Sequence, residues 1–376
     1  MKLYRTGLLA GVVAGAITFA ACGSDNNPPG SNSAGGSNAG GSSAGSSSGS
    51  VGDCATGSLK TEGSTAQQNA ITEWTKAYQQ KCSGSTIAYN GTGSGAGVKN
   101  FNAGQVDFAG SDSALNAAKG EIGAAARRCA SPALNLPMVT GPIAVAFQVS
   151  GVDKLTLTPS LIAKIFTGKI VAWDDAALMA ANSGVNLPAK PITVFFRGDS
   201  SGTSNNFAKY LAGAAPSDFT LKPDNAWPGK TGQGKTKSQG VQQAIQTTDG
   251  SIGYIEWSYA VNGGLKYASV DNGAGPVELN ADTAGKAVAA ATVAGTGDDL
   301  TLKLDYATKT PGAYPIILVT YEIVCSKYSD AAIGKLVRSF LTYTAGDGQS
   351  VLSDLGYAPL PAQIQAKVQA SVSKIG

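Results

Sequence analysis

A hydrophobic run, a short polar turn and a helical pattern follow one another in the middle of the chain. The run Pro191–Phe196 predicts a strand, and a helical spacing of apolar residues begins at Ser204. Between them stands Arg197-Gly-Asp-Ser-Ser-Gly-Thr203. A helix N-terminus attracts anions through its free N–H groups, and an arginine adds a permanently charged, bidentate donor. The segment therefore predicts a strand, a turn and a helix that together bind a tetrahedral oxyanion.

Three earlier strand-like runs also end in small polar loops. The loops are Glu62–Ala66, Gly93–Gly95 and Gly110–Asp112, and helical patterns follow the first two. Repeated strand-loop-helix units predict an α/β fold with a parallel sheet, in which ligands lie beyond the carboxyl ends of the strands. Three loops precede residue 113 and the Arg197 loop follows it, so we expect two lobes that share one ligand.

Two long apolar runs, Leu136–Phe147 and Tyr314–Val324, lie far apart in the sequence. We interpret them as the two crossings of a chain that leaves one lobe, builds the other and returns. The body of about 320 residues is also longer than most chains that fold around a single hydrophobic core, so we expect two domains. The predicted boundaries are 54–139 and 318–376 for lobe I, 140–317 for lobe II, and a hinge near Pro137–Gly141 and Tyr314–Val319.

The first 53 residues predict an exported, anchored protein. Lys2 and Arg5 precede a short apolar stretch that ends in Ala-Ala-Cys22, which resembles a bacterial lipobox. We predict a signal peptide at 1–21, lipidation at Cys22 and a flexible Gly/Ser-rich linker at 22–53. The predicted localisation is the extracellular face of the cell membrane. An ordinary cleaved signal with a coincidental cysteine is the alternative.

Four cysteines remain when Cys22 is set aside. An even number in an exported chain favours two disulfides, for which three pairings exist. We favour Cys54–Cys82, which would join the first strand to the end of the first helix, and Cys129–Cys325, which would join distant segments. Four reduced, buried thiols are the alternative.

The composition excludes several classes of chemistry. The chain has no histidine, so it has no Ser-His-Asp triad and no His-ligated zinc, and its 28 basic and 25 acidic residues do not suggest a nucleic-acid partner. Gly198–Gly202 matches a nucleophile motif but lacks a histidine base. Gly229–Thr236 matches a nucleotide-binding loop, but no core strand precedes it, and we interpret it as an exposed loop. We expect no enzyme, no metal and no cofactor.

Several separated motifs occur together in one order. They are Gly63-Ser-Thr65, Tyr89–Val98, Val106–Asp112, Arg197–Thr203, Gly253–Glu256 and Gly356–Pro361. With its lipobox and Gly/Ser tether, the chain resembles the PstS-type phosphate-binding lipoproteins of bacterial ABC transporters, and especially the mycobacterial and other actinobacterial members.

The resemblance implies a two-lobed periplasmic-binding-protein (type II) clamshell with a two-segment hinge. It implies a high-affinity receptor for inorganic phosphate, monomeric and lipid-anchored, that serves an ABC permease with a separate cytoplasmic ATPase. Ala66 stands where the family often has a bulky apolar residue, which makes the pocket wall smaller. The implied phosphate ligands are Ser64, Thr65, Ala66, Ser94, Asp112, Arg197, Ser201, Gly202 and Thr203, with Asp199 orienting Arg197.

Within this family, Asp112 is expected to accept the hydrogen that phosphate carries and sulfate lacks. The alternatives are that Asp112 caps a following helix, that Arg197 only pairs with Asp199, and that Thr65 and Ser94 only cap their loops. Alternative functions are binding of another oxyanion, such as arsenate, sulfate or molybdate, a secreted phosphatase or other hydrolase, and a surface adhesin or sensor.

Overall fold

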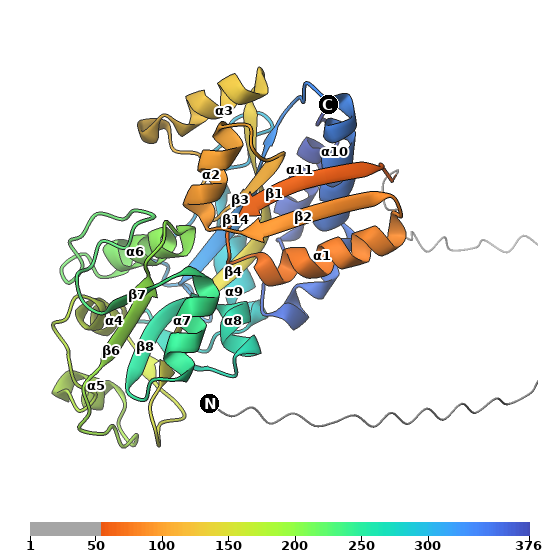
Figure 1. Ribbon diagram of the computed structural model, residues 1–376. Coiled ribbons are helices and arrows are strands. Elements are labelled where there is room, and N and C mark those ends of the chain that lie inside the picture. The colour runs from red at the N-terminus through yellow and green to blue at the C-terminus, as the bar shows by residue number, and fades with distance from the viewer. Residues whose placement is uncertain (1–53) are drawn as a thin grey trace, which may run out of the picture. The chain divides into compact units, whose positions relative to one another are not determined.

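The computed structural model describes residues 54–376 (Figure 1). The predicted signal peptide at 1–21, the lipidation site Cys22 and the linker at 22–53 lie outside the described residues. No helix within residues 54–376 is long and apolar enough to cross a membrane.

Three parallel strands form the first half of the main sheet. β1 (Gly57–Gly63) pairs with β2 (Ser85–Gly91) on one side and with β3 (Phe108–Ser111) on the other. Helix α1 (Gln68–Lys81) follows β1, and α2 (Ser94–Asn102) follows β2. The strand-loop-helix units predicted from this part of the sequence are therefore confirmed.

A second parallel group forms the other half. β6 (Thr193–Arg197) lies between β8 (Ser251–Glu256) and the short edge strand β7 (Gln233–Lys235). Helix α6 (Gly202–Ala214) follows β6, and α7 (Lys237–Gln246) follows β7. The strand-turn-helix predicted around the Arg197 loop is therefore present.

Two long strands join the halves. β4 (Ala133–Gln148) pairs with β14 (Ile317–Cys325) along residues 133–142 and with β8 along residues 143–148. Both pairings are antiparallel, as is that of β14 with β3, so the predicted parallel arrangement holds only within the groups β2-β1-β3 and β8-β6-β7. The two runs are buried almost throughout, and such continuous apolar runs indicate burial on both faces but not strand direction.

The whole sheet within residues 54–376 has nine strands in the order β2-β1-β3-β14-β4-β8-β6-β7, with β9 paired to β4. The strands outside this order are β5 (Thr156–Leu157), β9 (Lys266–Tyr267), β10 (Ser269–Asp271), β11 (Pro276–Val277), β12 (Thr292–Val293) and β13 (Leu302–Lys303). The remaining helices are η1 (Ala117–Lys119), α3 (Glu121–Cys129), α4 (Pro159–Phe166), α5 (Ala176–Ala181), α8 (Trp257–Asn262), α9 (Ala281–Ala289), α10 (Ala331–Ala345), η2 (Asp347–Val351), η3 (Ser353–Leu355) and α11 (Ala362–Val372).

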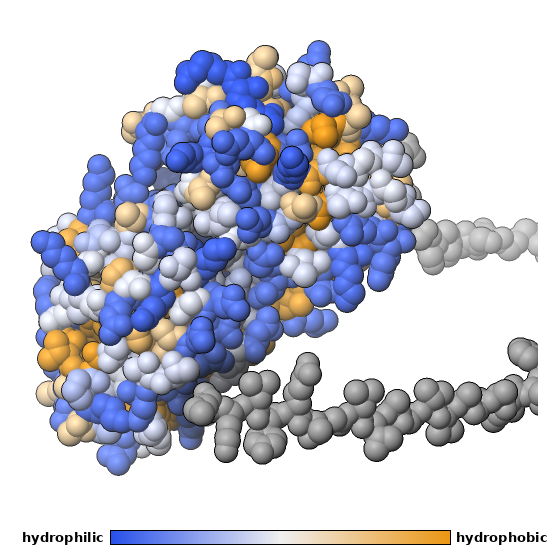
Figure 2. Space-filling model, viewed as in Figure 1, coloured by the Kyte–Doolittle hydropathy of each residue, from blue (hydrophilic) through white to orange (hydrophobic). Residues whose placement is uncertain are grey.

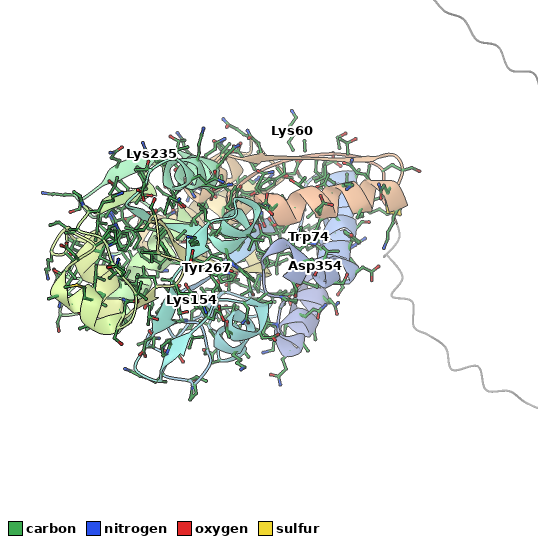
Figure 3. The ribbon with its side chains drawn as sticks, turned by 90° about the horizontal axis from the view of Figure 1, so that it is seen from below. Lys60, Trp74, Lys154, Lys235, Tyr267 and Asp354 are labelled. Atoms are coloured by element: carbon green, nitrogen blue, oxygen red, sulfur yellow. A yellow bond between two sulfur atoms is a disulfide. The ribbon has the colours of Figure 1, made fainter. Side chains whose placement is uncertain are left out.

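Each half of the sheet carries its own aromatic packing. Tyr78 of α1 packs edge-on against Phe340 of α10, with ring centroids 5.2 Å apart. In the other half, Phe207 of α6 stacks on Tyr254 of β8 at 4.5 Å. In Figure 3, Trp74 lies in one half of the molecule and Lys235 lies in the other. Hydrophilic residues dominate the face drawn in Figure 2, with hydrophobic ones in small groups.

Local boundaries differ from the predictions at three places. The helical pattern after the first strand predicts a helix from Thr65, but the first helix begins at Gln68. The helix after Arg197 begins at Gly202 instead of Ser204, because the Ser201 hydroxyl caps it. Residues 233–235 form β7, so the interpretation of Gly229–Thr236 as a loop throughout is wrong. A strand at the very edge of a sheet needs no apolar run, which explains why its sequence does not reveal it.

Both favoured disulfides are present. Cys54 is bonded to Cys82, and Cys129 is bonded to Cys325. The first ties the entry to β1 to the end of α1, and the second ties the end of α3 to the end of β14. The alternative of four reduced thiols is therefore wrong.

Removing the long-range disulfide by the double change Cys129→Ala and Cys325→Ala should lower the free energy of unfolding by about 2–4 kcal/mol. The bond closes a loop of 196 residues, whereas Cys54–Cys82 closes one of 28. Loop-closure entropy predicts a loss about 1–2 kcal/mol smaller for the matched double variant at Cys54 and Cys82. Denaturant unfolding measures both losses, and a larger loss from the shorter loop would contradict the prediction.

Candidate functional site

Four loops that are separate in the sequence meet near the junction of the two halves of the sheet. They follow β1, β2, β3 and β6, and Figure 1 shows the ends of β1 and β6 facing the middle of the molecule. All nine residues proposed as ligands are buried: Ser64, Thr65, Ala66, Ser94, Asp112, Arg197, Ser201, Gly202 and Thr203.

The carboxylate of Asp112 lies at the centre of a group of hydroxyls. Ser64 Oγ and Thr320 Oγ1 donate to Asp112 Oδ1, the second over 2.8 Å. Ser94 Oγ and Thr203 Oγ1 donate to Asp112 Oδ2 over 3.1 and 3.5 Å. The donors come from both halves of the sheet, so this carboxylate is a meeting point for four separate segments.

Asp112 caps no helix. The next helical turn is η1, and its N-cap is Asn116, whose side chain accepts from the backbone N–H groups of Ala118 and Lys119. Asn206 of α6 donates to the backbone carbonyl of Asp112 over 2.7 Å and holds the loop from the opposite half. The alternative interpretation of Asp112 as a helix cap is therefore wrong.

Arg197 is a buried cation at the end of β6. Its guanidinium donates to both oxygens of Asp199, from Nε over 2.8 Å and from Nη2 over 2.5 Å. Its Nη1 donates to Ser238 Oγ over 3.3 Å, so Arg197 does not pair with Asp199 alone. The backbone N–H of Lys237 also donates to Asp199. Asp199 therefore holds the guanidinium by two hydrogen bonds.

The remaining hydroxyls complete the group. Thr65 Oγ1 lies 2.8 Å from Ser238 Oγ, and Ser64 Oγ accepts from the backbone N–H of Ala66. Ser94 is the first residue of α2, and Ser201 Oγ caps α6 by accepting from Ser204 N. Thr65 and Ser94 each also contact a side chain far away in the sequence, so they do more than cap their own loops.

Two glycines permit the halves to approach closely. A methyl group at Gly202 would lie 2.5 Å from Asp112 Cβ, and one at Gly95 would lie 2.0 Å from Ser200 Oγ. The backbone N–H of Gly95 donates to the carbonyl of Ser200 over 3.2 Å. These contacts explain why both loops need a residue without a side chain.

The two carboxylates differ in their electrostatics. Burial raises the pKa of Asp112 above its usual value, and the hydroxyls and Arg197 oppose this only in part. Burial acts on the pKa of Asp199 in the same direction, but Arg197 and the Lys237 N–H outweigh it and the pKa is lowered. Asp199 is therefore stabilised as the ionised counter-ion of Arg197. Asp112, in contrast, is surrounded by hydroxyl donors and is easier to protonate than an ordinary aspartate.

Surface pockets reach this group from two sides. Asp112, Asn205 and Asn206 line one pocket, and Thr65, Tyr89 and Lys237 line another. A group of three or more possible metal-ligating residues does not occur among the residues that the structure describes. The described residues of the cluster therefore provide a ligand with hydrogen-bonding groups and the positive charge of Arg197.

Comparison with known proteins gives the family. Residues 48–347 match the family model described as the PBP superfamily domain. The phosphate-binding proteins PstS 3 and PstS 2 of Mycobacterium tuberculosis are 43% and 44% identical to the chain, over 381 and 380 residues, and cover 100% of each sequence. The chain belongs to the PstS family.

A solved structure confirms the fold of this PstS-family chain. A high-affinity periplasmic phosphate-binding protein, bound with phosphate at pH 8.5, superposes with a TM-score of 0.68. The match covers 84% of this chain and 93% of that one at 24% sequence identity. At that identity the likeness shows the fold alone, which is the α/β fold predicted from the sequence.

Three residues of this cluster were not found from the sequence. Ser238 lies at the start of α7, Thr320 lies in β14 and Asn206 lies in α6. Asn206 falls within the helix predicted after the Arg197 loop, so the strand-turn-helix pattern could have placed it near the site. Ser238 follows the unrecognised edge strand, and Thr320 lies inside an apolar run, so neither has a local signal.

Proposed function

We propose that this PstS-family chain binds inorganic phosphate at the junction of the two halves of its sheet and delivers it to an ABC permease. One observation carries the proposal: a buried guanidinium and a buried carboxylate, Arg197 and Asp112, belong to one cluster of hydroxyl donors. The names of the full-length mycobacterial relatives support it, since each is called a phosphate-binding protein.

The number and direction of the hydroxyl hydrogens in the cluster favour phosphate over sulfate. Each hydroxyl has a single hydrogen, and Ser64, Ser94 and Thr203 direct theirs at Asp112. A hydroxyl that turns to donate to a phosphate oxygen releases Asp112, which then accepts the hydrogen that phosphate carries at neutral pH. Sulfate has no hydrogen to give and would face the carboxylate unpaired, which costs several kcal/mol.

We propose that the ligand is held between two lobes, with boundaries at 54–139 and 318–376 for lobe I and at 140–317 for lobe II. Support comes from β4 and β14, which pair with each other and connect the two parallel groups of strands. A change of twist in this pair, near Pro137–Gly141 and Tyr314–Val319, would open and close the site.

Anchoring and partners complete the proposed function. A lipid on Cys22 and the linker at 22–53 would hold the described body at the extracellular face of the membrane, as a monomer. A separate cytoplasmic subunit would supply ATP hydrolysis for transport. Loss of phosphate uptake on deletion of the chain would distinguish this role from that of an adhesin or sensor.

Calorimetric titration of residues 54–376 with phosphate and then with sulfate at neutral pH tests the binding. We expect tight phosphate binding and no detectable sulfate binding. Absence of phosphate binding in folded, ligand-stripped protein would overturn the proposal. Arsenate, as a near-isostere, is titrated in parallel, and turnover of a chromogenic phosphate ester would indicate a phosphatase instead.

Ser238→Ala should weaken phosphate binding by about tenfold. Ser238 Oγ lies between Thr65 Oγ1 and Arg197 Nη1, and a hydrogen bond to a charged group contributes about 1.5–3 kcal/mol. The dissociation constant of phosphate measures the effect. Ser353→Ala, at an exposed position of η3, is the matched control, and equal affinities for the two variants would contradict the prediction.

A further inference from the structure

A second buried carboxyl group lies behind the proposed phosphate site. Glu322 of β14 is 1% exposed and is the Cα partner of Gly110 in β3 and of Leu136 in β4. Gly110 precedes Asp112 by two residues. Among the described residues, no lysine or arginine forms an ion pair with Glu322. A carboxylate buried in this way without a counter-ion is strongly disfavoured.

The carboxamide of Gln67 lies over Gly110, next to Glu322. A methyl group at Gly110 would lie 2.0 Å from Gln67 Nε2 and 2.6 Å from Tyr89 Oη. Residues directly opposite each other in an antiparallel pair project to the same face of the sheet. Gln67 and Glu322 therefore share this face, directly beneath the loop that carries Asp112.

The direction of one hydrogen-bond chain is set by a carbonyl. The hydroxyl of Tyr89 donates to the backbone carbonyl of Ser64 over 2.7 Å, which uses its single hydrogen. Tyr89 Oη therefore accepts from the neighbouring amide, and Gln67 Nε2 donates to it over 3.0 Å. This orientation of the amide leaves Gln67 Oε1 in need of a donor.

Two buried acceptors are left over on this face. Gln67 Oε1 and Glu322 Oε2 have no hydrogen-bond partner within the described part of the chain. Two acceptors cannot bond to each other unless one of them carries a proton. A carboxylic acid at Glu322 supplies that proton, and one O–H then satisfies both atoms.

The electrostatics point in the same direction. Burial raises the pKa of Glu322 to about 8; the side chain of Gln67 opposes this, and the negative charge of Asp112 adds to it. Tyr89, the other titratable neighbour, has a pKa raised well above its usual value by burial and by Glu322, so it stays neutral. The positive charge of Arg197 lowers the pKa of Asp112 and is not among the causes that shift the pKa of Glu322.

We propose that Glu322 is a neutral carboxylic acid that donates to Gln67 Oε1 and so positions Ser64 through Gln67 and Tyr89. The proposal rests on the proposed phosphate function, because Ser64 is one of the proposed ligands. Ionisation of Glu322 replaces the donor with a repelling acceptor and places a negative charge behind an anion site. Glu322 is thus a positioning residue whose protonation supports binding.

The first test is the pH profile of the phosphate dissociation constant between pH 6.5 and pH 9.5. We compare wild type with Glu322→Gln, which stays neutral and keeps an N–H donor, and with Glu322→Leu, which has none. Dividing the wild-type dissociation constant by that of Glu322→Gln at each pH removes the titration of phosphate itself. Glu73→Gln, at a partly exposed position of α1, is the charge control.

The ratio of wild-type to Glu322→Gln dissociation constants should rise with pH. A group with a pKa of about 8 is protonated in about one molecule in ten at pH 9, so the ratio should rise about tenfold from pH 7 to pH 9. Glu322→Leu should bind more weakly than Glu322→Gln at every pH. A flat ratio, or equal binding by the two variants, overturns the proposal.

A second measurement does not depend on phosphate. The infrared carbonyl band of a protonated carboxyl group should be present at pH 7 in wild type and reduced in Glu322→Gln, with the band of any other buried acid unchanged. An identical band in both overturns the proposal. If wild type binds no phosphate, the proposed function fails, and this band alone decides the protonation of Glu322.

Discussion

Replacing Arg197 with glutamine should weaken phosphate binding by about a thousandfold. The change removes the positive charge from the cluster and leaves Asp112 and Asp199 beside an incoming anion. Hydrogen bonds from a charged donor contribute about 1.5–3 kcal/mol each, so the loss of two corresponds to about 4 kcal/mol. Calorimetric titration, with competition for the tightest complexes, measures the change.

Lys235→Gln is the matched control for this charge change. Lys235 is the Cα partner of Arg197 in the pairing of β6 with β7, and its side chain is partly exposed. Its removal should change the affinity by less than about threefold, with an effect that salt suppresses. The phosphate affinity of Arg197→Lys should lie between those of Arg197→Gln and Lys235→Gln, because lysine keeps the charge but loses the bidentate pairing with Asp199. Binding by Arg197→Gln within about threefold of wild type would refute the assigned role.

Asp112→Asn should relax the selectivity for phosphate over sulfate by about a hundredfold or more. The carboxylate is proposed to accept the hydrogen of phosphate and to repel sulfate, and the neutral amide can donate to either anion. An unpaired like-charge contact costs about 3 kcal/mol or more when it is buried. Titrations of both anions give the ratio of their dissociation constants.

The same residue predicts a pH dependence. Asp112 discriminates only while it is ionised, and burial raises its pKa above the usual value. Selectivity should therefore be complete well above that pKa and decline as the pH falls through it, at a higher pH than for an ordinary aspartate. Asp354→Asn, exposed on η3, is the control, and unchanged selectivity in Asp112→Asn would assign discrimination to other residues.

Much of the fold and site can be predicted because the relevant signals are local. The Arg197 loop joins a strand to a helix within seven residues, and the loops after β1 and β2 repeat that arrangement. In a parallel group, strand ends meet at one edge, so the loops were expected to lie together. The even cysteine count predicted two disulfides but left three pairings open, and the pairing that was favoured is present.

Contacts between distant segments could not be predicted. Thr320 reaches Asp112 across 208 residues, and Ser238 reaches Thr65 across 173. A threonine within an apolar run or a serine after an edge strand has no distinguishing sequence pattern. Strand direction was hidden as well, because the apolar runs at β4 and β14 report burial but not orientation.

The sequence by itself determined the chemistry of this protein: one arginine, short hydroxyl residues and Asp112 placed in loops, with no histidine for catalysis. The tertiary structure decided which of these groups meet and in which protonation state they are held. Glu322 illustrates the difference, since burial in the folded sheet and the nearby charge of Asp112 raise the pKa of what is an ordinary glutamate in the sequence. The physical reason is that desolvation and long-range contact depend on packing, whereas turn and capping preferences depend on neighbours in the chain.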